Sequence, residues 1–272
     1  MRRLKKIIPF FSFCLILIFP GYIYFTQESQ IFRSKVLPTD FIYQWDQPFE
    51  EHYIKVEPNI HLNALFFPSE QKKGLVFYLH GRGGNLAHPW GAVAKNFTDR
   101  GYDCFIFDYR GFGKSDGKIH KEQILLSDAE KAYHFAVENF PADKIIFYGR
   151  SLGTGLATYL ASKYFPHMLI LESPYLSLLD TAVKSKPYLP KFLINILLKY
   201  PLRTDLWITS VTCPIYIFHG TADRIIPYNS SLALEKLCPP TYPIKVTLFK
   251  DVTHNHVVKN QLYQSELDQI LQ

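Results

Sequence analysis

The sequence predicts an α/β protein with a mostly parallel central sheet and helices on both faces. Apolar, β-prone runs alternate along the chain with helix-compatible runs, a pattern typical of parallel sheets that are covered on both sides. The chain has 272 residues, of which 47% are hydrophobic, and this suits one domain with a sizeable core. A glycine-rich turn at residues 149–153 joins a predicted strand to a predicted helix, at the sheet edge where such folds carry their sites.

The first 25 residues predict a transmembrane helix that acts as an uncleaved signal anchor. Arg2, Arg3, Lys5 and Lys6 precede a run of nineteen residues, 7–25, that carries no charge. A helix of that length spans about 30 Å of hydrocarbon, and the basic flank predicts a cytoplasmic N-terminus with the rest of the chain extracytoplasmic. A cleaved signal peptide and a peripheral helix are the alternatives, although no small-residue cleavage site follows the run.

The charge balance argues against a nucleic-acid-binding role. The chain has 30 basic and 24 acidic residues, and four of the basic residues precede the apolar run. The remainder is therefore close to neutral and lacks a basic footprint for nucleic acid. The four cysteines show no metal-ligand spacing, and Cys213 with Cys238 is a candidate disulfide if the domain is exported.

Residues 26–50 are predicted to be a polar linker, followed by a single domain over 51–272. The domain opens with a β-hairpin, whose strands 52–56 and 60–67 flank a turn at Pro58 and Asn59. Short apolar runs predict further strands at 74–80, 102–108, 144–148, 168–172, 214–219 and 244–249. Helical runs ended by glycine, proline or the next strand predict helices at 86–100, 121–140, 153–164, 229–237 and about 258–271.

The segment at about 173–210 interrupts the alternation of strands and helices. It contains four prolines and an apolar, helix-like run at 192–198, and it lies between the sixth and seventh predicted strands. One interpretation is a small helical cap whose apolar underside covers acyl chains. The other is an enlarged connecting helix of the sheet.

Residues 149–153 spell G-x-S-x-G, the sequence of a nucleophile elbow. The strand before the motif and the helix after it supply the setting that the elbow needs. Because a side chain two residues before or after Ser151 would collide with the neighbouring strand and helix, both positions favour glycine. The turn also places the backbone N–H of Leu152 at a helix N-terminus, where it can face an oxyanion. The alternative is a glycine-rich turn with an incidental serine.

A serine nucleophile needs a base and an acid that orients the base, in the chain order serine, acid, histidine for this kind of fold. Asp223 follows a buried strand at the carboxyl edge of the sheet, whereas no strand places Asp205. His254 and His256 both follow the last predicted strand, and in an extended loop only one of them faces Ser151. We expect His254 to be the base.

The second oxyanion donor is expected from the loop after strand 74–80. This loop reads His-Gly-Arg-Gly-Gly-Asn at 80–85, and its glycines allow backbone N–H groups to approach a substrate oxygen. The backbone N–H of Arg82 is the expected donor. The Arg82 side chain either contacts an anionic substrate group or is solvated, and solvation is the simpler expectation.

Together these stretches resemble the α/β-hydrolase superfamily, specifically the BEM46-like (ABHD13-like) membrane-anchored serine hydrolases. The resemblance covers about residues 50–260 and rests on HGRGGN at 80–85, DYRGFGKSDG at 108–117, YGRSLGTGLA at 148–157, LESPYLSL at 171–178, CPIYIFHGTADRIIP at 213–227 and THN at 253–255. It implies a Ser151–Asp223–His254 triad with Arg82 and Leu152 as oxyanion donors. The chain departs from the family at Val252, Thr253 and His256, where the family often has a glycine before the histidine and an acid after the asparagine; this affects the expected loop geometry.

The expected function is hydrolysis of carboxylic esters, of acyl or lipid type, through a serine triad and an acyl-enzyme. The chemistry requires no metal or cofactor, and the sequence indicates no nucleic acid and no obligate protein partner. The expected partners are a small-molecule ester and, through the N-terminal helix, a membrane. Two alternatives are acyl transfer by the same triad and a catalytically silent, membrane-tethered binding protein on a hydrolase scaffold.

Overall fold

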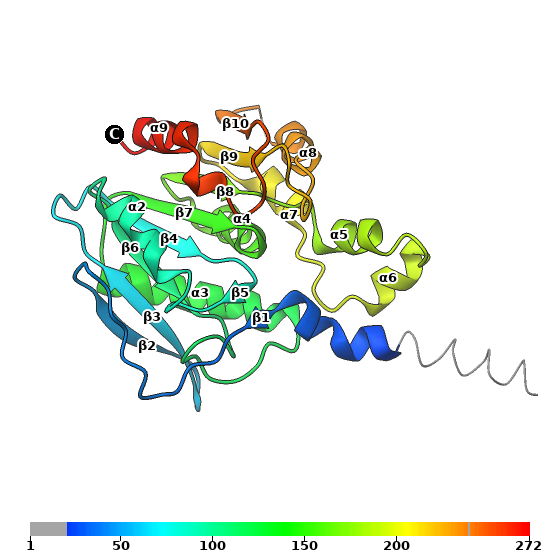
Figure 1. Cartoon of the computed structure of the whole chain (residues 1–272), viewed down its shortest axis with the longest axis horizontal. Helices are drawn as coiled ribbons and strands as arrows, with labels where there is room; N and C mark the ends of the chain where they lie inside the picture. Colours follow the sequence, from blue (N-terminus) through cyan, green and yellow to red (C-terminus); the bar gives the residue numbers. More distant parts are fainter. Residues whose placement is uncertain (1–20, 239) are drawn as a thin grey trace, which may run out of the picture.

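A mostly parallel sheet of eight strands forms the centre of the computed structural model, which describes residues 21–238 and 240–272. Its strands are β2 (Glu50–Glu57), β3 (Ile60–Phe67), β4 (Leu75–Leu79), β6 (Asp103–Phe107), β7 (Ile145–Arg150), β8 (Met168–Glu172), β9 (Ile215–Gly220) and β10 (Ile244–Phe249). They lie in the order β10-β9-β8-β7-β4-β6-β3-β2, from top to bottom in Figure 1. Only the pairings of β3 with β2 and β6 are antiparallel. The predicted sheet is confirmed.

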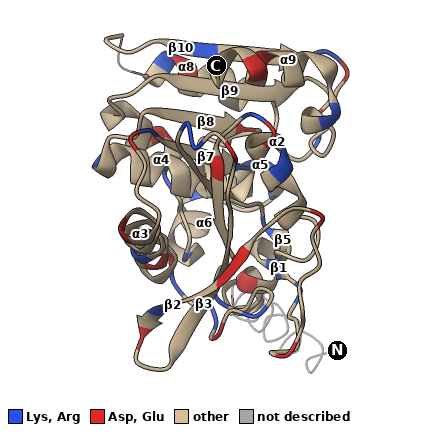
Figure 2. Ribbon diagram, turned by 90° about the vertical axis from the view of Figure 1, so that its left-hand side faces the viewer, with Lys and Arg blue, Asp and Glu red and all other residues tan. Residues whose placement is uncertain are grey.

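Helices cover both faces of this sheet, as the sequence predicts (Figure 2). One face packs against α3 (Glu122–Asn139), α4 (Leu152–Tyr164) and α8 (Asn229–Leu237). The other packs against α2 (Lys95–Thr98) and α9 (Gln261–Ile270). The sheet therefore separates two cores. Because neighbouring side chains of a strand alternate between faces, Phe77 lies in the core under α3, α4 and α8, and Tyr78 lies in the core under α2 and α9.

Two predicted helices are shorter in the structure. The helix expected at 86–100 is reduced to a 3₁₀ turn, η1 (Gly91–Ala94), and α2, because residues 85–90 form a tight turn instead. In that turn the N–H of His88 donates to both the backbone and the side-chain oxygen of Asn85. The last helix divides into η3 (Val257–Lys259) and α9, where the Asn260 side chain caps α9 by accepting the N–H of Leu262.

The segment 173–210 contains both a helical cap and connecting helices of the sheet, the two structures that its sequence allows. Helices α5 (Leu178–Ser185) and α6 (Lys191–Leu197) project from the sheet as a cap (Figure 1). The following α7 (Thr204–Trp207) and η2 (Ile208–Ser210) pack against α4 as part of the body of the fold. The cap therefore occupies the first part of the segment.

The segment predicted as a linker, 26–50, packs against the rest of the protein. Residues 21–31 are helical, and β1 (Arg33–Ser34) pairs in parallel with β5 (Gly83–Gly84). Phe32 and Tyr43 are buried in the two cores. Residues 1–20, which hold most of the predicted anchor, lie outside the described residues. In the part of the chain that is described, no helix combines the length and the apolar character that a membrane span requires.

The candidate disulfide between Cys213 and Cys238 is not formed. Both cysteines are free in the structure, as is Cys104. Cys104 is fully buried in the core.

Candidate active site

Ser151 lies at the tip of a sharp turn between β7 and α4. Its backbone has φ 51° and ψ −114°, which is strained for a residue with a side chain. The Ser151 N–H donates to the carbonyl oxygen of Glu172 at 2.9 Å, and its own carbonyl oxygen accepts the N–H of Thr154 at 3.0 Å. These bonds hold the serine at the carboxyl edge of the sheet.

The glycines on either side of Ser151 are required by contacts with backbone atoms. A Cβ on Gly149 would lie 2.6 Å from the carbonyl oxygen of Gly153. A Cβ on Gly153 would lie 2.0 Å from the carbonyl oxygen of Leu79, at the end of β4. The structure therefore confirms the steric reason for glycine at both positions of the motif.

His254 bridges Ser151 and Asp223. Its Nε2 lies 3.0 Å from Ser151 Oγ, and its Nδ1 lies 2.6 Å from Asp223 Oδ2. Since a carboxylate only accepts hydrogen bonds, Nδ1 carries the proton and Nε2 is left to accept the serine hydroxyl proton. All three residues are 7–8% exposed, so water competes little with these bonds.

Four donors surround the Asp223 carboxylate. Oδ1 accepts the N–H groups of Ile225 and Ile226 at 2.8 and 2.9 Å, and Oδ2 lies 2.6 Å from His254 Nδ1. His219 Nε2 donates to the Ile226 carbonyl oxygen at 2.9 Å and also lies 3.2 Å from Oδ2. Burial acts to raise the pKa of the Asp223 carboxyl, but bonds from His219 and His254 outweigh it and hold this pKa well below its usual range. Asp223 is therefore ionised and keeps His254 oriented.

The loops that carry Asp223 and His254 are joined directly. The N–H of Ala222 donates to the carbonyl oxygen of Val252 at 3.0 Å. A Cβ on Gly220 would lie 2.1 Å from that same oxygen, so glycine permits the close approach of the two loops. The departure from the family pattern at Val252 thus leaves the Asp223–His254 pairing intact.

Arg150, between Gly149 and Ser151, ties the histidine loop to the sheet. Its Nε donates to Glu172 Oε1 at 2.8 Å, while Nη2 reaches the His254 carbonyl oxygen at 3.3 Å and Asn255 Oδ1 at 3.2 Å. Its guanidinium also lies 5.0 Å from the centre of the Trp90 ring. Burial acts to lower the pKa of Arg150, but the Glu172 carboxylate raises it, so the guanidinium stays charged.

The two predicted oxyanion donors lie at the same cavity as Ser151. Within the described residues, the backbone N–H groups of Arg82 and Leu152 have no acceptor, and both residues line this cavity. His80 Nδ1 donates to the Gly81 carbonyl oxygen at 2.7 Å. That oxygen and the Arg82 N–H belong to one planar peptide group, so the bond fixes the direction of the N–H.

The cavity beside Ser151 has a volume of about 440 Å³, within the range of about 300–1,000 Å³ usual for small-molecule sites. The cap forms one wall through α5 and α6. The helical segment 21–31 forms another and lies beside α6 (Figure 1). Most of the lining is apolar and includes Ile23, Ile31, Leu178, Ala182, Leu189 and Ile194. The sequence predicts the cap but gives no sign that residues 21–31 reach the site.

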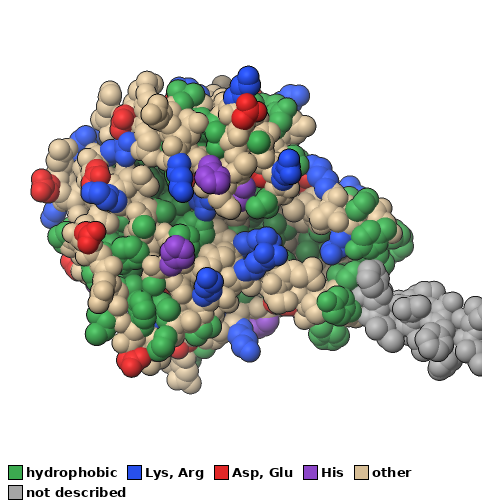
Figure 3. All heavy atoms as spheres, in the orientation of Figure 1, with side chains coloured by type: hydrophobic (Ala, Val, Ile, Leu, Met, Phe, Trp, Pro, Cys, Tyr) green, Lys and Arg blue, Asp and Glu red, His purple; other side chains and the backbone are tan. Residues whose placement is uncertain are grey.

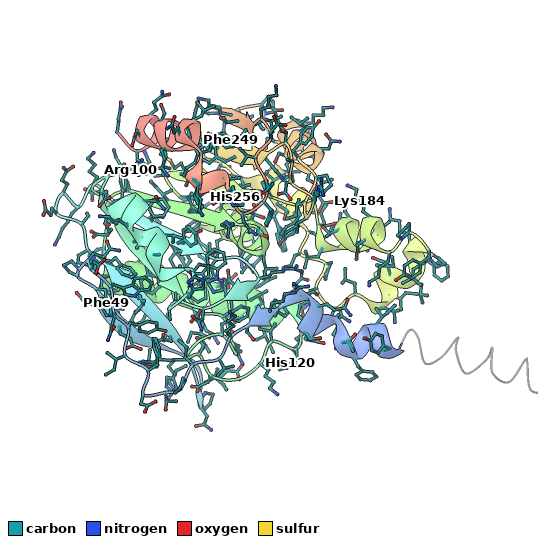
Figure 4. All side chains as sticks on the ribbon, in the orientation of Figure 1. Phe49, Arg100, His120, Lys184, Phe249 and His256 are labelled. Atoms are coloured by element: carbon teal, nitrogen blue, oxygen red, sulfur yellow. The ribbon has the colours of Figure 1, made fainter. Side chains whose placement is uncertain are left out.

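The competing candidates from the sequence lie elsewhere. His256 is exposed and its Nδ1 bonds to Thr253 Oγ1 at 2.6 Å (Figure 4). Asp205 pairs with Arg203 at 2.7 Å. His219 was not predicted as a site residue, although it stands four residues before Asp223 in the same motif. Within residues 21–238 and 240–272, no three His, Cys, Asp or Glu side chains are grouped to suit a metal ion.

Comparison with known proteins agrees with this architecture. Residues 74–196 match the family described as alpha/beta hydrolase fold. An uncharacterised protein of Acanthamoeba polyphaga mimivirus, R595, is 30% identical over 222 residues, which cover 75% of this chain and 74% of that protein. The lysophosphatidylserine lipase ABHD12 of Danio rerio is 31% identical over 172 residues, covering 57% of this chain and 44% of ABHD12. The structure of the Pyrococcus furiosus esterase Pf2001 has a TM-score of 0.71 at 18% identity, covering 89% of this chain and 97% of the esterase.

The sheet order, the serine turn and these similarities define one class of protein. The chain belongs to the α/β-hydrolase superfamily, and its relatives make it an ABHD-like member. The expected resemblance to this superfamily is confirmed.

Proposed function

We propose that the protein is a serine hydrolase that cleaves carboxylic esters of acyl or lipid type. The observation that carries the proposal is the continuous row of hydrogen bonds from Ser151 Oγ through His254 to the Asp223 carboxylate, at a strained turn. A serine hydroxyl is a weak nucleophile, and a base with an orienting carboxylate is the arrangement that activates it. The name of ABHD12 and the esterase fold of Pf2001 support this reaction type.

In the proposed mechanism, Ser151 Oγ attacks the ester carbonyl carbon while its proton passes to His254 Nε2. The N–H groups of Arg82 and Leu152 stabilise the negative charge on the former carbonyl oxygen. His254 then gives its proton to the leaving alcohol, and an acyl group remains on Ser151. A water molecule, deprotonated by His254, releases the acid and restores the serine. Asp223 stays ionised throughout and stabilises the charged form of His254.

The apolar cavity supports an acyl chain as the part of the substrate that fills it. Burial of a chain between α5, α6 and residues 21–31 removes apolar surface from water, which favours binding by about 0.8 kcal/mol per CH₂ group. We therefore expect long-chain esters to bind more tightly than acetyl esters.

Labelling with a fluorophosphonate probe tests the proposal. Membranes that carry the wild-type protein should be labelled, and the Ser151→Ala variant should not be. If the folded wild-type protein is not labelled, Ser151 is not activated and the hydrolase proposal fails.

We also propose that the charge-free run 7–25 anchors the protein in a membrane, with the N-terminus cytoplasmic and the hydrolase domain extracytoplasmic. Residues 21–25 then form the end of the anchor at the membrane surface, because Ile23 also lines the cavity. The charge-free run behind four basic residues supports this orientation. Two separate tests apply: extraction of membranes at alkaline pH, and protease treatment of sealed vesicles whose cytoplasmic face is outward. Release of the full chain by alkali would contradict the anchor, and digestion of the domain in sealed vesicles without detergent would contradict its orientation.

A further inference from the structure

Helix α6 carries apolar side chains on two opposite sides, and the described part of the protein covers only one of them. Ile194 and Leu197 line the cavity beside Ser151. Phe192 and Ile196 lie on the outward side and are 67% and 71% exposed. Since a helix at the surface of a soluble protein normally carries one apolar stripe, the second side of α6 indicates a further apolar contact.

The helical segment 21–31 has a similar exposed side next to α6. Its Tyr22 and Phe25 are 61% and 78% exposed, and hydrogen bonds of Gln27 tie the segment to the end of α6. Figure 3 shows apolar side chains gathered at this end of the molecule, over the cap and over the first described residues. Exposed apolar clusters of this kind mark contacts with a protein or a membrane. The cap face is formed by Tyr22, Phe25, Phe192 and Ile196.

The position of the charge-free run favours a membrane as the partner of the cap face. The run ends at residue 25, and its nineteen residues span about 28 Å as a helix, close to the thickness of the hydrocarbon layer. A chain that crosses the bilayer there places Phe25 at the outer boundary of the hydrocarbon, and Gln27 lies about 3 Å further along the helix axis. Because Gln27 donates to the Leu197 carbonyl oxygen at 3.0 Å, the end of α6 is held at the same depth.

The charges around the cap face fit lipid head groups better than a second copy of this chain. Residues 178–199 contain four lysines and one aspartate. Asp180 and Glu28 pair with two of these lysines, which leaves this end of the molecule with a net positive charge. An isologous contact would bring two such surfaces together, whereas lysine side chains beside a bilayer extend toward its phosphate groups.

We propose that the cap face rests on the outer surface of the membrane, with Phe192 and Ile196 dipping into the boundary between head groups and acyl chains. Tyrosine favours this boundary, and short helices with large apolar residues on one side lie in it. The cavity behind α6 and residues 21–31 is then held at the bilayer surface, close to esters that reside there. The inference starts from the proposed anchor and goes beyond it, because it assigns a second membrane contact about 170 residues further along the chain.

Quenching of an added tryptophan by brominated lipid tests this contact without depending on catalysis. The full-length Phe192→Trp protein is placed in phosphatidylcholine nanodiscs, one protein per disc, with and without bromine atoms near the top of the acyl chains. Phe165→Trp is the matched control, because Phe165 is 69% exposed and lies between α4 and the start of β8, at the sheet edge opposite the cap. The wild type supplies the background of its three tryptophans.

We expect Phe192→Trp to lose most of its added fluorescence in the brominated discs and to emit at a shorter wavelength than Phe165→Trp. The added fluorescence of Phe165→Trp should be the same in both kinds of disc. Equal quenching of the two variants, or no quenching of either, would overturn the proposal. Emission of Phe192→Trp at a shorter wavelength without quenching would also overturn it, because protein would then cover the outward side of α6 in place of lipid.

The anchor and the cap face fail in different experiments. Resistance to alkaline extraction without quenching of Phe192→Trp removes the cap face and leaves the anchor. Release by alkali with quenching retained removes the anchor, and the cap face then holds the protein at the membrane by itself. Fluorophosphonate labelling tests the hydrolase independently of both. Equal unfolding temperatures of Phe192→Trp and Phe165→Trp show that a difference in quenching does not come from misfolding.

Discussion

Ser151 adopts φ 51° and ψ −114°, a conformation that persists only where the surrounding structure fixes it. His254 is fixed as firmly, because its ring bonds to Asp223 and its carbonyl oxygen accepts from Arg150. Ser151, Asp223 and His254 could be predicted from the sequence because each follows a strand at the same edge of the sheet. The role of His219 was not predictable, since nothing in the sequence shows that its ring turns back toward Asp223.

The two histidines of the last loop should differ sharply in their effect on catalysis. His254→Ala removes the group that accepts the Ser151 proton, so kcat for ester hydrolysis should fall by roughly 10⁴- to 10⁶-fold. His256→Ala, the matched control two residues away, should change kcat less than about threefold, because that ring bonds to Thr253. The measurement is steady-state hydrolysis of a long-chain ester, and a larger loss in His256→Ala would reverse the assignment.

The carboxyl of Asp223 should make stability depend on acid pH. Its pKa in the folded protein lies below the value of about 3.9 expected in the unfolded chain, so the unfolded state binds the proton more readily. The ionised group therefore contributes stability in full above about pH 5, and this contribution declines as the pH falls below about 4.

Urea unfolding of the wild type and of Asp223→Asn over a series of pH values measures this contribution. The difference in unfolding free energy between them should stay constant near neutral pH and become less favourable to the wild type on acidification. A difference that shifts in favour of the wild type as the pH falls would show that the pKa is raised instead.

At the scale of elements, the site is built where β4, β7, β8 and β9 end side by side. Helix α4 starts directly after Ser151 and packs so closely against the end of β4 that Gly153 touches the Leu79 carbonyl oxygen. The predicted strands and most helices were correct because their apolar runs are bounded by glycine, proline or polar turns. The helix expected at 86–100 was too long, because the Asn85 side chain stabilises a turn that hydrophobic periodicity does not reveal.

Gly153→Ala should disrupt the contact between α4 and β4. The added Cβ would lie 2.0 Å from a backbone oxygen, so the strand or the helix must move, at a cost of about 1–3 kcal/mol in unfolding free energy or more. Gly83→Ala is the control, since its Cβ would lie 3.7 Å from the nearest atom, an ordinary contact. Chemical denaturation measures both, and equal stabilities would contradict the close approach seen at Gly153.

At the scale of the whole molecule, residues far apart in sequence enclose the cavity. The sequence predicts the sheet, the cap and the three residues of the proposed triad, because each follows from local pattern and chain order. It does not predict that residues 21–31 form a wall of the cavity, since this depends on contacts with α6 and its following loop. Gln27 makes two of them, donating to the Leu197 carbonyl oxygen at 3.0 Å and accepting the Lys199 N–H at 2.8 Å.

Gln27→Ala should loosen the wall of the cavity without touching the serine site. We expect KM for a palmitoyl ester to rise by about threefold to tenfold, as loss of about one or two hydrogen bonds implies, while kcat for a short-chain ester stays the same. Ser29→Ala, on the exposed side of the same helix, is the control. Unchanged KM values for the long ester in both variants would show that the helical segment does not hold the acyl chain.

The bonds of Gln27 and Glu28 with residues 197–200 also bear on how the protein assembles. They join positions about 170 residues apart in the chain, so the first described helix must wait for its partners to be synthesised. Contacts between such distant positions form slowly in folding. The acyl cavity is thus expected to close only after residues 197–200 have emerged, and a nascent chain at a membrane would gain its complete catalytic pocket later still, once His254 has followed.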